Sequence, residues 1–141
     1  MSSRIRPIFL VEDNPMDLDL AKRAFARRKT ANPIEVARDG EEALDWLSRW
    51  EGGAPIPVVI LLDLKLPKVD GLDVLYQIKI HPLFQKIPVV VLTTSSEDRD
   101  VQTAYERGAN SYIVKPVDFD RFIQVIDQIE QYWCNLNTPS M

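Results

Sequence analysis

Residues 57–71 read PVVILLDLKLPKVDG. The five consecutive apolar residues from Val58 to Leu62 show no polar alternation, which is the pattern of a parallel β-strand covered on both faces. The carboxylate of Asp63 follows this strand directly, and Pro67 and Gly71 then indicate a turn. The sequence therefore predicts a buried strand that ends in a charged group, and the charge calls for an explanation.

Short apolar runs and helical patterns alternate along the whole chain. Besides the strand at 58–62, the runs at 7–11, 34–37, 87–95 and 110–116 predict strands. Apolar residues spaced by three and four predict helices between and after these strands. The inward-facing residues that this spacing indicates are Leu18, Ala21 and Phe25, then Ala43, Leu44 and Leu47, then Leu72, Leu75 and Ile78, and last Phe119, Phe122, Ile126, Ile129 and Trp133.

Helix boundaries are also marked in the sequence. Asn14 before Pro15 predicts the N-cap and the first residue of the first helix. Asp39 can cap the second helix. The fourth helix is predicted over 98–107, because Gly108 easily adopts the left-handed conformation that ends a helix.

Five strand–helix units with short connections predict an α/β domain with a mostly parallel sheet flanked by helices. The chain has 141 residues, 45% of them hydrophobic, which is enough to bury one core. No linker, repeat or low-complexity segment divides it. We therefore expect a single domain over 1–141, with a core of about 5–134 and a short C-terminal tail at 135–141.

Charge, hydropathy and residue counts argue against several classes of protein. The net charge is −4 and no run of Lys or Arg exceeds three residues, so we expect no nucleic-acid partner. No apolar run approaches the roughly 18 residues of a membrane span, and we expect a soluble, cytoplasmic protein without a membrane partner. With Cys134 and His81 each alone, the sequence gives no support for a disulfide, a multi-thiolate metal site or a Ser/His/Asp triad.

Polar residues follow four of the predicted strands where each one ends. In parallel sheets these carboxyl ends share one edge, where ligands bind. Carboxylates crowded there would repel one another, each pair by roughly 4 kcal/mol at 4 Å under an effective dielectric near 20. A divalent cation would relieve that repulsion, and Mg²⁺ takes hard oxygen ligands of this kind. The residues at the four strand ends are Glu12 and Asp13, Asp63, Thr93 to Ser95, and Lys115.

Each of these residues also has an ordinary structural explanation. Asp63 taken alone is more often a turn or helix cap than a ligand, and Glu12 and Asp13 before Asn-Pro suit capping of the first helix. Thr93 is compatible with the start of a loop, and Lys115 with a solvated surface lysine. What favours a functional site is that acids, hydroxyls and a lysine from distant parts of the chain are expected at one edge.

Four segments of the chain resemble the receiver domain of two-component response regulators, and the resemblance extends from about Ile5 to Cys134. It implies a flavodoxin-like fold, a single doubly wound sheet of five parallel strands in the order 2-1-3-4-5 flanked by five helices. It also implies a response regulator of a phosphorelay, which accepts a phosphoryl group from a histidine kinase on an aspartate and switches its protein contacts. The four segments are FLVEDN (9–14), LLDLKLPKVDG (61–71), VVVLTTS (89–95) and SYIVKP (111–116).

The resemblance makes Asp63 the phosphoacceptor and Mg²⁺ the cofactor. A carboxylate is a poor nucleophile toward an anionic phosphoryl group unless the charges are offset, which a divalent cation does. By the resemblance, Asp13 and Asp63 bind the metal directly and the backbone carbonyl of Lys65 completes the protein's share. Glu12 stands where the family often has Asp, and direct contact with the metal and contact through water both stay open for it.

Lys115 and Thr93 are the other catalytic residues that the resemblance implies. Lys115 would pair with one phosphoryl oxygen and the Thr93 hydroxyl would bind another. Thr93 and Tyr112 would form the switch, with Thr93 moving toward the phosphoryl group and Tyr112 turning inward. The resemblance further implies a cis bond between Lys115 and Pro116. Such a protein is not a classical enzyme, although it catalyses its own phosphorylation from phosphohistidine and its slow autodephosphorylation.

The resemblance also suggests partners. Residues 89–100 are similar to regulators that accompany bacterial phytochrome kinases, so a phytochrome-type histidine kinase is an expected phosphodonor. A homodimer is expected through the face of the fourth helix, fifth strand and fifth helix, with 119–133 as its candidate surface. Two alternatives stay open: a receiver-fold interaction module that ignores phosphate, and, less favoured because of Lys65, an Asp-nucleophile phosphatase.

Overall fold

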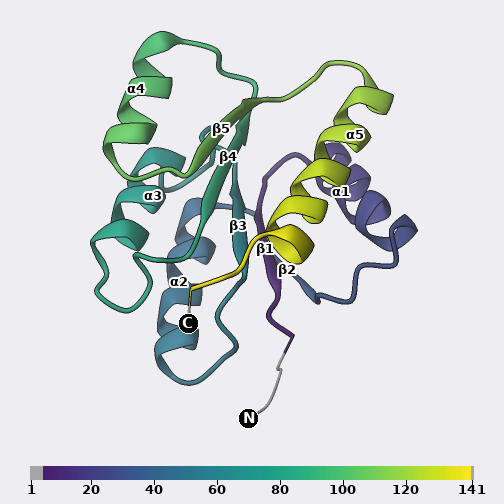
Figure 1. The fold of residues 1–141 in the computed structure, drawn as a ribbon. Helices are drawn as coiled ribbons and strands as arrows, with labels where there is room; N and C mark the ends of the chain where they lie inside the picture. Colours follow the sequence, from purple (N-terminus) through teal and green to yellow (C-terminus); the bar gives the residue numbers. More distant parts are fainter. Residues whose placement is uncertain (1–4, 141) are drawn as a thin grey trace.

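The computed structural model describes residues 5–140, which form a sheet of parallel strands covered by helices (Figure 1). The strands are β1 (Ile8–Val11), β2 (Ile34–Ala37), β3 (Val59–Leu62), β4 (Val89–Thr93) and β5 (Ser111–Val114). Their order in the sheet is β2-β1-β3-β4-β5, which confirms the predicted fold. The predicted domain covers 1–141, but residues 1–4 and 141 lie outside the residues that the structure describes. The bounds of the domain therefore stay a prediction.

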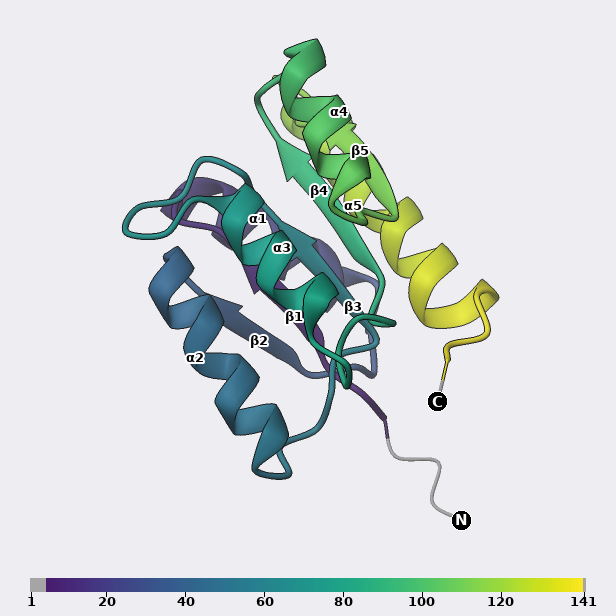
Figure 2. The same cartoon turned by 90° about the vertical axis from the view of Figure 1, so that its left-hand side faces the viewer.

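Helices cover both faces of the sheet. They are α1 (Pro15–Arg27), α2 (Gly40–Glu51), α3 (Gly71–Ile80), α4 (Asp98–Glu106) and α5 (Phe119–Glu130), and a π-helical turn, Gln131–Leu136, continues α5. The pair α1 and α5 packs on one face, and α2, α3 and α4 cover the other (Figures 1 and 2). Within residues 5–140, no helix combines the length and the apolar composition that crossing a membrane requires.

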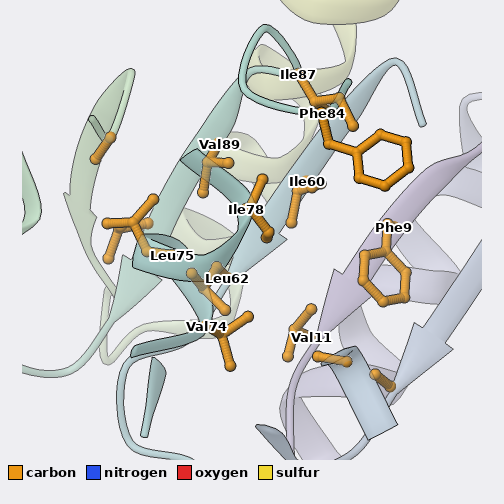
Figure 3. Packing of buried hydrophobic residues seen from close by; sticks show 14 of the residues in the cluster. Phe9, Val11, Ile60, Leu62, Val74, Leu75, Ile78, Phe84, Ile87 and Val89 are labelled. Atoms are coloured by element: carbon orange, nitrogen blue, oxygen red, sulfur yellow. The ribbon is translucent and has the colours of Figure 1, made fainter. Parts of the chain in front are cut away.

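Strand β1 shows why the buried strands carry no polar alternation. Phe9 and Val11 pack into the core on the side of α2 and α3, which Figure 3 shows from close by. Ile8 and Leu10 pack into a second core, with residues of α1 and α5. Full burial of an aliphatic side chain contributes about 1.5–3 kcal/mol, so successive residues on both faces of the strand are apolar.

The helix boundaries predicted from Asn14, Asp39 and Gly108 are confirmed. Asn14 caps α1, and its Oδ1 accepts hydrogen bonds from the N–H groups of Met16 and Asp17. The Asp39 side chain caps α2 in the same way. Gly108, just after α4, has a φ of +102°, which is the left-handed conformation expected of it.

Two expectations are wrong. Phe119 is 57% exposed, because it is the first residue of α5 and the buried residues of this helix begin one turn later, at Phe122. No peptide bond in the described part of the chain is cis, so the Lys115–Pro116 bond is trans. The tertiary amide still favours trans slightly, and Lys115 reaches its carboxylate partners from a trans bond. Leu44, Leu47, Leu72 and Trp133 are half-buried at the edges of the two cores.

Candidate functional site

The carboxyl ends of the strands bring side chains that are distant in sequence to one edge of the sheet. Glu12 follows β1 and Asp63 follows β3, and these two strands are hydrogen-bonded neighbours. Lys115 follows β5, whose neighbour β4 ends at Thr93. Because all the strands are parallel, these four residues share the edge that the sequence predicts.

Lys115 lies at the centre of the site. Its Nζ is 2.7 Å from Glu12 Oε1, 2.9 Å from Asp63 Oδ2 and 2.9 Å from Asp17 Oδ2, and its side chain is 5% exposed. Burial alone would lower the pKa of this ammonium, but the hydrogen bonds to the three carboxylates outweigh burial and raise the pKa. Lys115 therefore stays charged and offsets part of the negative charge around it.

Glu12, Asp13 and Asp63 form what we call the acidic cluster. One carboxylate oxygen of each residue lies within 4.8 Å of those of the other two. Glu12 and Asp63 are buried, whereas Asp13 is exposed, so the acidic cluster is open to water on one side. Three carboxylate oxygens at a site open to water through Asp13 are a donor set that fits a hard divalent cation such as Mg²⁺.

The loop after β3 is held tightly at Asp63. The Lys65 N–H donates to Asp63 Oδ1 at 3.1 Å, and the Gly71 N–H donates to the Leu64 carbonyl at 3.0 Å. A Cβ at position 71 would overlap the carbonyl oxygen of Asp63, so the first residue of α3 has to be glycine for this loop to sit as it does. Metal binding by the Lys65 carbonyl stays a prediction.

Burial has a strong effect on Glu12. Burial raises the pKa of Glu12 to about 7, and the contact with Lys115 and the Asn14 N–H, which donates to Oε2 at 3.0 Å, only partly oppose the rise. Because the folded-state pKa is raised, the contribution of Glu12 to stability is fully present below its ordinary pKa of 4.5. That contribution is lost as the pH rises through about 7.

We predict that divalent-cation affinity rises with pH up to about 7 because of Glu12. Below its pKa this carboxylate must release a proton before it can act as a ligand, so the affinity should change by up to about tenfold per pH unit and level off above the pKa. Calorimetric titration with Mg²⁺ across this range measures the slope. A Glu12→Gln variant, which cannot titrate, should lose the pH dependence, and an equally steep slope in that variant would contradict the prediction.

Thr93 ends β4 with its side chain fully buried. Its Oγ1 has no hydrogen-bond partner among the residues that the structure describes. A buried hydroxyl without a partner is unfavourable by about 1–3 kcal/mol. The Thr93 hydroxyl therefore has an unused hydrogen-bond donor at the end of β4.

Tyr112 links β5 to the loop between β4 and α4. Its hydroxyl donates to the Ser95 carbonyl at 2.9 Å, and Ser95 Oγ donates to Asp100 Oδ2 in α4 at 2.6 Å. The tyrosine side chain is half-buried and packs against the core on the side of α3 and α4. Contacts therefore run from β5, which Lys115 follows, to the first turn of α4.

One residue of the site was missed in the sequence. Asp17 contacts Lys115 as closely as Asp63 does. An acid in the first turn of a helix is ordinary, because it interacts favourably with the free N–H groups there, so nothing in the pattern set Asp17 apart. The sequence offered one indication of its role: Asp17 lies about one helical turn beyond Glu12 and Asp13, the acids that follow β1.

A family model of the response regulator receiver domain matches residues 8–127. FilR2, a probable methanogenesis regulatory protein of Methanothrix harundinacea, is 47% identical over 92% of this chain and 84% of its own length. The response regulator Rcp1 of Synechocystis sp. is 38% identical over 89% of this chain and 87% of its own. These matches extend over most of each relative.

Solved structures agree with the sequence matches. The phosphorylated cyanobacterial phytochrome response regulator RcpA superposes with a TM-score of 0.91 at 37% identity, over 98% of this chain and 100% of RcpA. The Mn²⁺-bound form of Rcp1 superposes with a TM-score of 0.89 at 35% identity, over 96% of this chain and 99% of Rcp1. The similarity therefore extends to the whole fold.

Proposed function

The chain belongs to the receiver-domain family of two-component response regulators, and on that premise we propose that Asp63 is the residue that carries its phosphoryl group. As a member of this family it is a response regulator that interacts with a histidine kinase, and it is not a classical enzyme. The observation that carries the proposal is the position of Asp63, which shares the Lys115 ammonium with Glu12 and adjoins the exposed Asp13.

Asp63 is suited to act as the nucleophile. Its two oxygens are held by Lys115 Nζ at 2.9 Å and the Lys65 N–H at 3.1 Å. In the proposed transfer, an Asp63 oxygen bonds to phosphorus while the bond from phosphorus to the imidazole nitrogen of the donor histidine breaks, and the imidazole takes up a proton. Autodephosphorylation is also part of the proposal: a water oxygen bonds to phosphorus while the bond from phosphorus to the Asp63 oxygen breaks, the water gives up a proton to the solvent, and inorganic phosphate and the free Asp63 carboxylate result.

Receiver domains bind a divalent metal, and we assign Mg²⁺ to the acidic cluster. Asp13 and Asp63 would bind it directly, Glu12 directly or through water, and the Lys65 carbonyl would complete the protein ligands. When bound, the cation offsets the negative charge of the carboxylates and of the incoming phosphoryl oxygens. The hard oxygen donors of the acidic cluster support this assignment.

Two further side chains would contact oxygens of the phosphoryl group. The Lys115 ammonium is already in contact with Asp63, so it would pair with an oxygen of a group carried there. The buried Thr93 hydroxyl, which has no partner among the described residues, would donate to another. Both contacts would form only once the phosphoryl group is in place, and they would stabilise the phosphorylated conformation.

We further propose that Thr93 and Tyr112 carry the signal. Movement of the Thr93 hydroxyl toward the phosphoryl group would shift the end of β4 and the loop after it, whose Ser95 carbonyl accepts the Tyr112 hydrogen bond. Tyr112 would then repack farther inward and change the surface around α4. A two-state equilibrium a few kcal/mol from balance is sufficient for such coupling.

The phosphodonor in this proposal is a phytochrome-type histidine kinase, because RcpA, which is 37% identical, is a phytochrome response regulator. The proposal includes a single domain over 1–141 and a cytoplasmic location, where kinases find their ATP. A receiver-fold module that ignores phosphate is the alternative. The complete set of acids, hydroxyl and lysine at one edge of the sheet favours the phosphoacceptor.

Incubation with Mg²⁺ and acetyl phosphate, followed by intact-mass measurement, tests the proposed function. The unmodified chain should gain the mass of one phosphoryl group, and the gain should disappear when Mg²⁺ is chelated. An Asp63→Asn variant, which keeps the shape of the side chain but not the nucleophilic carboxylate, should gain none. If the chain stays unlabelled under conditions that label a control receiver domain, the alternative of a receiver-fold module that does not respond to phosphate is favoured.

The surface around α4, β5 and α5 is our candidate for a homodimer interface. Its elements and the loop between β5 and α5 carry several exposed apolar side chains, of which Val117 and Phe119 are 100% and 57% exposed. Val114 and Tyr105, on the neighbouring β5 and α4, are 44% and 49% exposed. Apolar surface of this kind is typical of the centre of a protein–protein interface.

We predict that Phe119→Asp shifts the chain from dimer to monomer, because it places a charge within this apolar surface. Sedimentation velocity over a concentration series, with and without phosphorylation, measures the shift. Leu83→Asp, which changes a side chain 67% exposed after α3, is the matched control and should leave the mass unchanged. A wild-type chain that stays at monomer mass throughout would reject the interface.

A further inference from the structure

Asp17 is a carboxylate of the site to which the proposed function gives no role. Its Oδ2 is 2.9 Å from Lys115 Nζ, and its side chain is 23% exposed. Asp19, two residues farther along α1, is 57% exposed and pairs with Arg23 on the outer surface. Asp17 is not part of the acidic cluster. It therefore contacts the lysine without belonging to the candidate cation site.

The start of α1 fixes the position of Asp17. Asn14 Oδ1 accepts a hydrogen bond from the Asp17 N–H at 3.2 Å, and Pro15 is the first helical residue. Asp17 is thus in the first turn, where the free N–H groups favour a negative side chain. A capped helix, rather than a loop, holds this carboxylate at the ammonium of Lys115.

Lys115 and a divalent cation in the acidic cluster would share two carboxylates. The lysine contacts Glu12 and Asp63, which are two of the three members of the acidic cluster. A cation bound there would draw on these carboxylates and repel the nearby ammonium. A buried ammonium cannot lose its counter-charges without a large penalty. Asp17 is the contact that the cation leaves intact.

We propose that Asp17 is a positioning residue that holds the Lys115 ammonium when a divalent cation occupies the acidic cluster. The inference rests on the proposed function, which supplies the cation. Asp17 weakens the competition between the two positive charges, because the lysine keeps a partner that the metal does not use. It also keeps Lys115 beside Asp63, within reach of an oxygen of a phosphoryl group carried there.

Calorimetric titration with Mg²⁺, without any phosphodonor, tests this role. At about pH 8, where Glu12 is ionised, Asp17→Asn should weaken Mg²⁺ binding about fivefold, because the ammonium then depends on the carboxylates of the acidic cluster alone. Asp19→Asn removes the same charge from the same helix at an exposed position, and should weaken binding by less than about twofold. Equal effects of the two variants, or an unchanged affinity in Asp17→Asn, would overturn the proposal.

A double-mutant cycle separates action through Lys115 from a general charge effect. In the Lys115→Met background, Asp17→Asn should have no more effect on Mg²⁺ affinity than Asp19→Asn has. The same fivefold loss in both backgrounds would show that Asp17 acts only as a nearby charge. If the wild type binds Mg²⁺ and Asp17→Asn binds it equally well, only this inference fails; if the wild type binds no divalent cation, the proposed metal site fails with it.

Discussion

Gly71→Ala is expected to lower the free energy of unfolding by about 3 kcal/mol and to slow phosphoryl transfer to Asp63 severely. The new Cβ would overlap the Asp63 carbonyl oxygen and lie 2.5 Å from the Leu64 Cα. These are backbone atoms of the loop that carries the phosphoacceptor, so the clash cannot be relieved by rotating a side chain. The loop and the start of α3 would have to separate, which displaces Asp63 from Lys115.

Urea unfolding and the rate of labelling by acetyl phosphate measure the two effects of Gly71→Ala. Gly52→Ala is the matched control, because its Cβ would come no closer than 3.5 Å to the carbonyl oxygens of Ser48 and Arg49. This control should change stability by less than about 1 kcal/mol and leave labelling intact. Similar losses in both variants would mean that the close approach at position 71 does not hold the loop.

Lys115→Met is expected to lower the free energy of unfolding by about 3 kcal/mol in cation-free buffer at about pH 8, above the pKa of Glu12. The lysine side chain is 5% exposed and contacts Glu12, Asp17 and Asp63, so its removal leaves three crowded carboxylates without a counter-charge. Mg²⁺ should restore much of the loss, because a ligand that binds only the folded state stabilises it by mass action. Phosphorylation should no longer switch the surface around α4, since the ammonium that would bind the phosphoryl group is gone.

Chemical unfolding with and without Mg²⁺ measures the effect of Lys115→Met. Lys22→Met, at an exposed position of α1, is the control and should change stability by less than about 0.5 kcal/mol. A Lys115→Met variant as stable as the wild type without cations would contradict the role assigned to this ammonium. If Mg²⁺ does not restore the stability of Lys115→Met, repulsion among the carboxylates is not the cause of the loss.

Local patterns were sufficient to predict an α/β domain with a mostly parallel sheet, whereas the strand order came from the family resemblance. Unbroken apolar runs such as Val58 to Leu62 occur where a strand is covered on both faces, and the structure has such a strand there. Asn14, Asp39 and Gly108 marked helix ends correctly because capping depends on neighbouring residues. Phe119 was wrongly predicted to face the core, because the spacing of apolar residues along a helix does not say where the helix first meets the sheet.

The site was predictable only in part. Glu12, Asp63 and Lys115 stand directly after strands, so a parallel sheet places them at one edge, and the strand order implied by the resemblance places them near one another. Asp17 depends instead on how α1 crosses the strand ends, which the sequence pattern does not fix. The trans bond at Lys115–Pro116 corrects an expectation that came from the family resemblance alone.

Reductive trapping after phosphorylation tests most directly whether Asp63 is the phosphoacceptor. Borohydride reduces an acyl phosphate to the alcohol, so a phosphorylated aspartate becomes homoserine, which peptide mass spectrometry can locate. We predict homoserine at position 63, only after treatment with Mg²⁺ and acetyl phosphate, and unchanged side chains at Asp13 and Asp17. An unchanged Asp63, with the phosphoryl group found on another residue or on none, would contradict the proposed function.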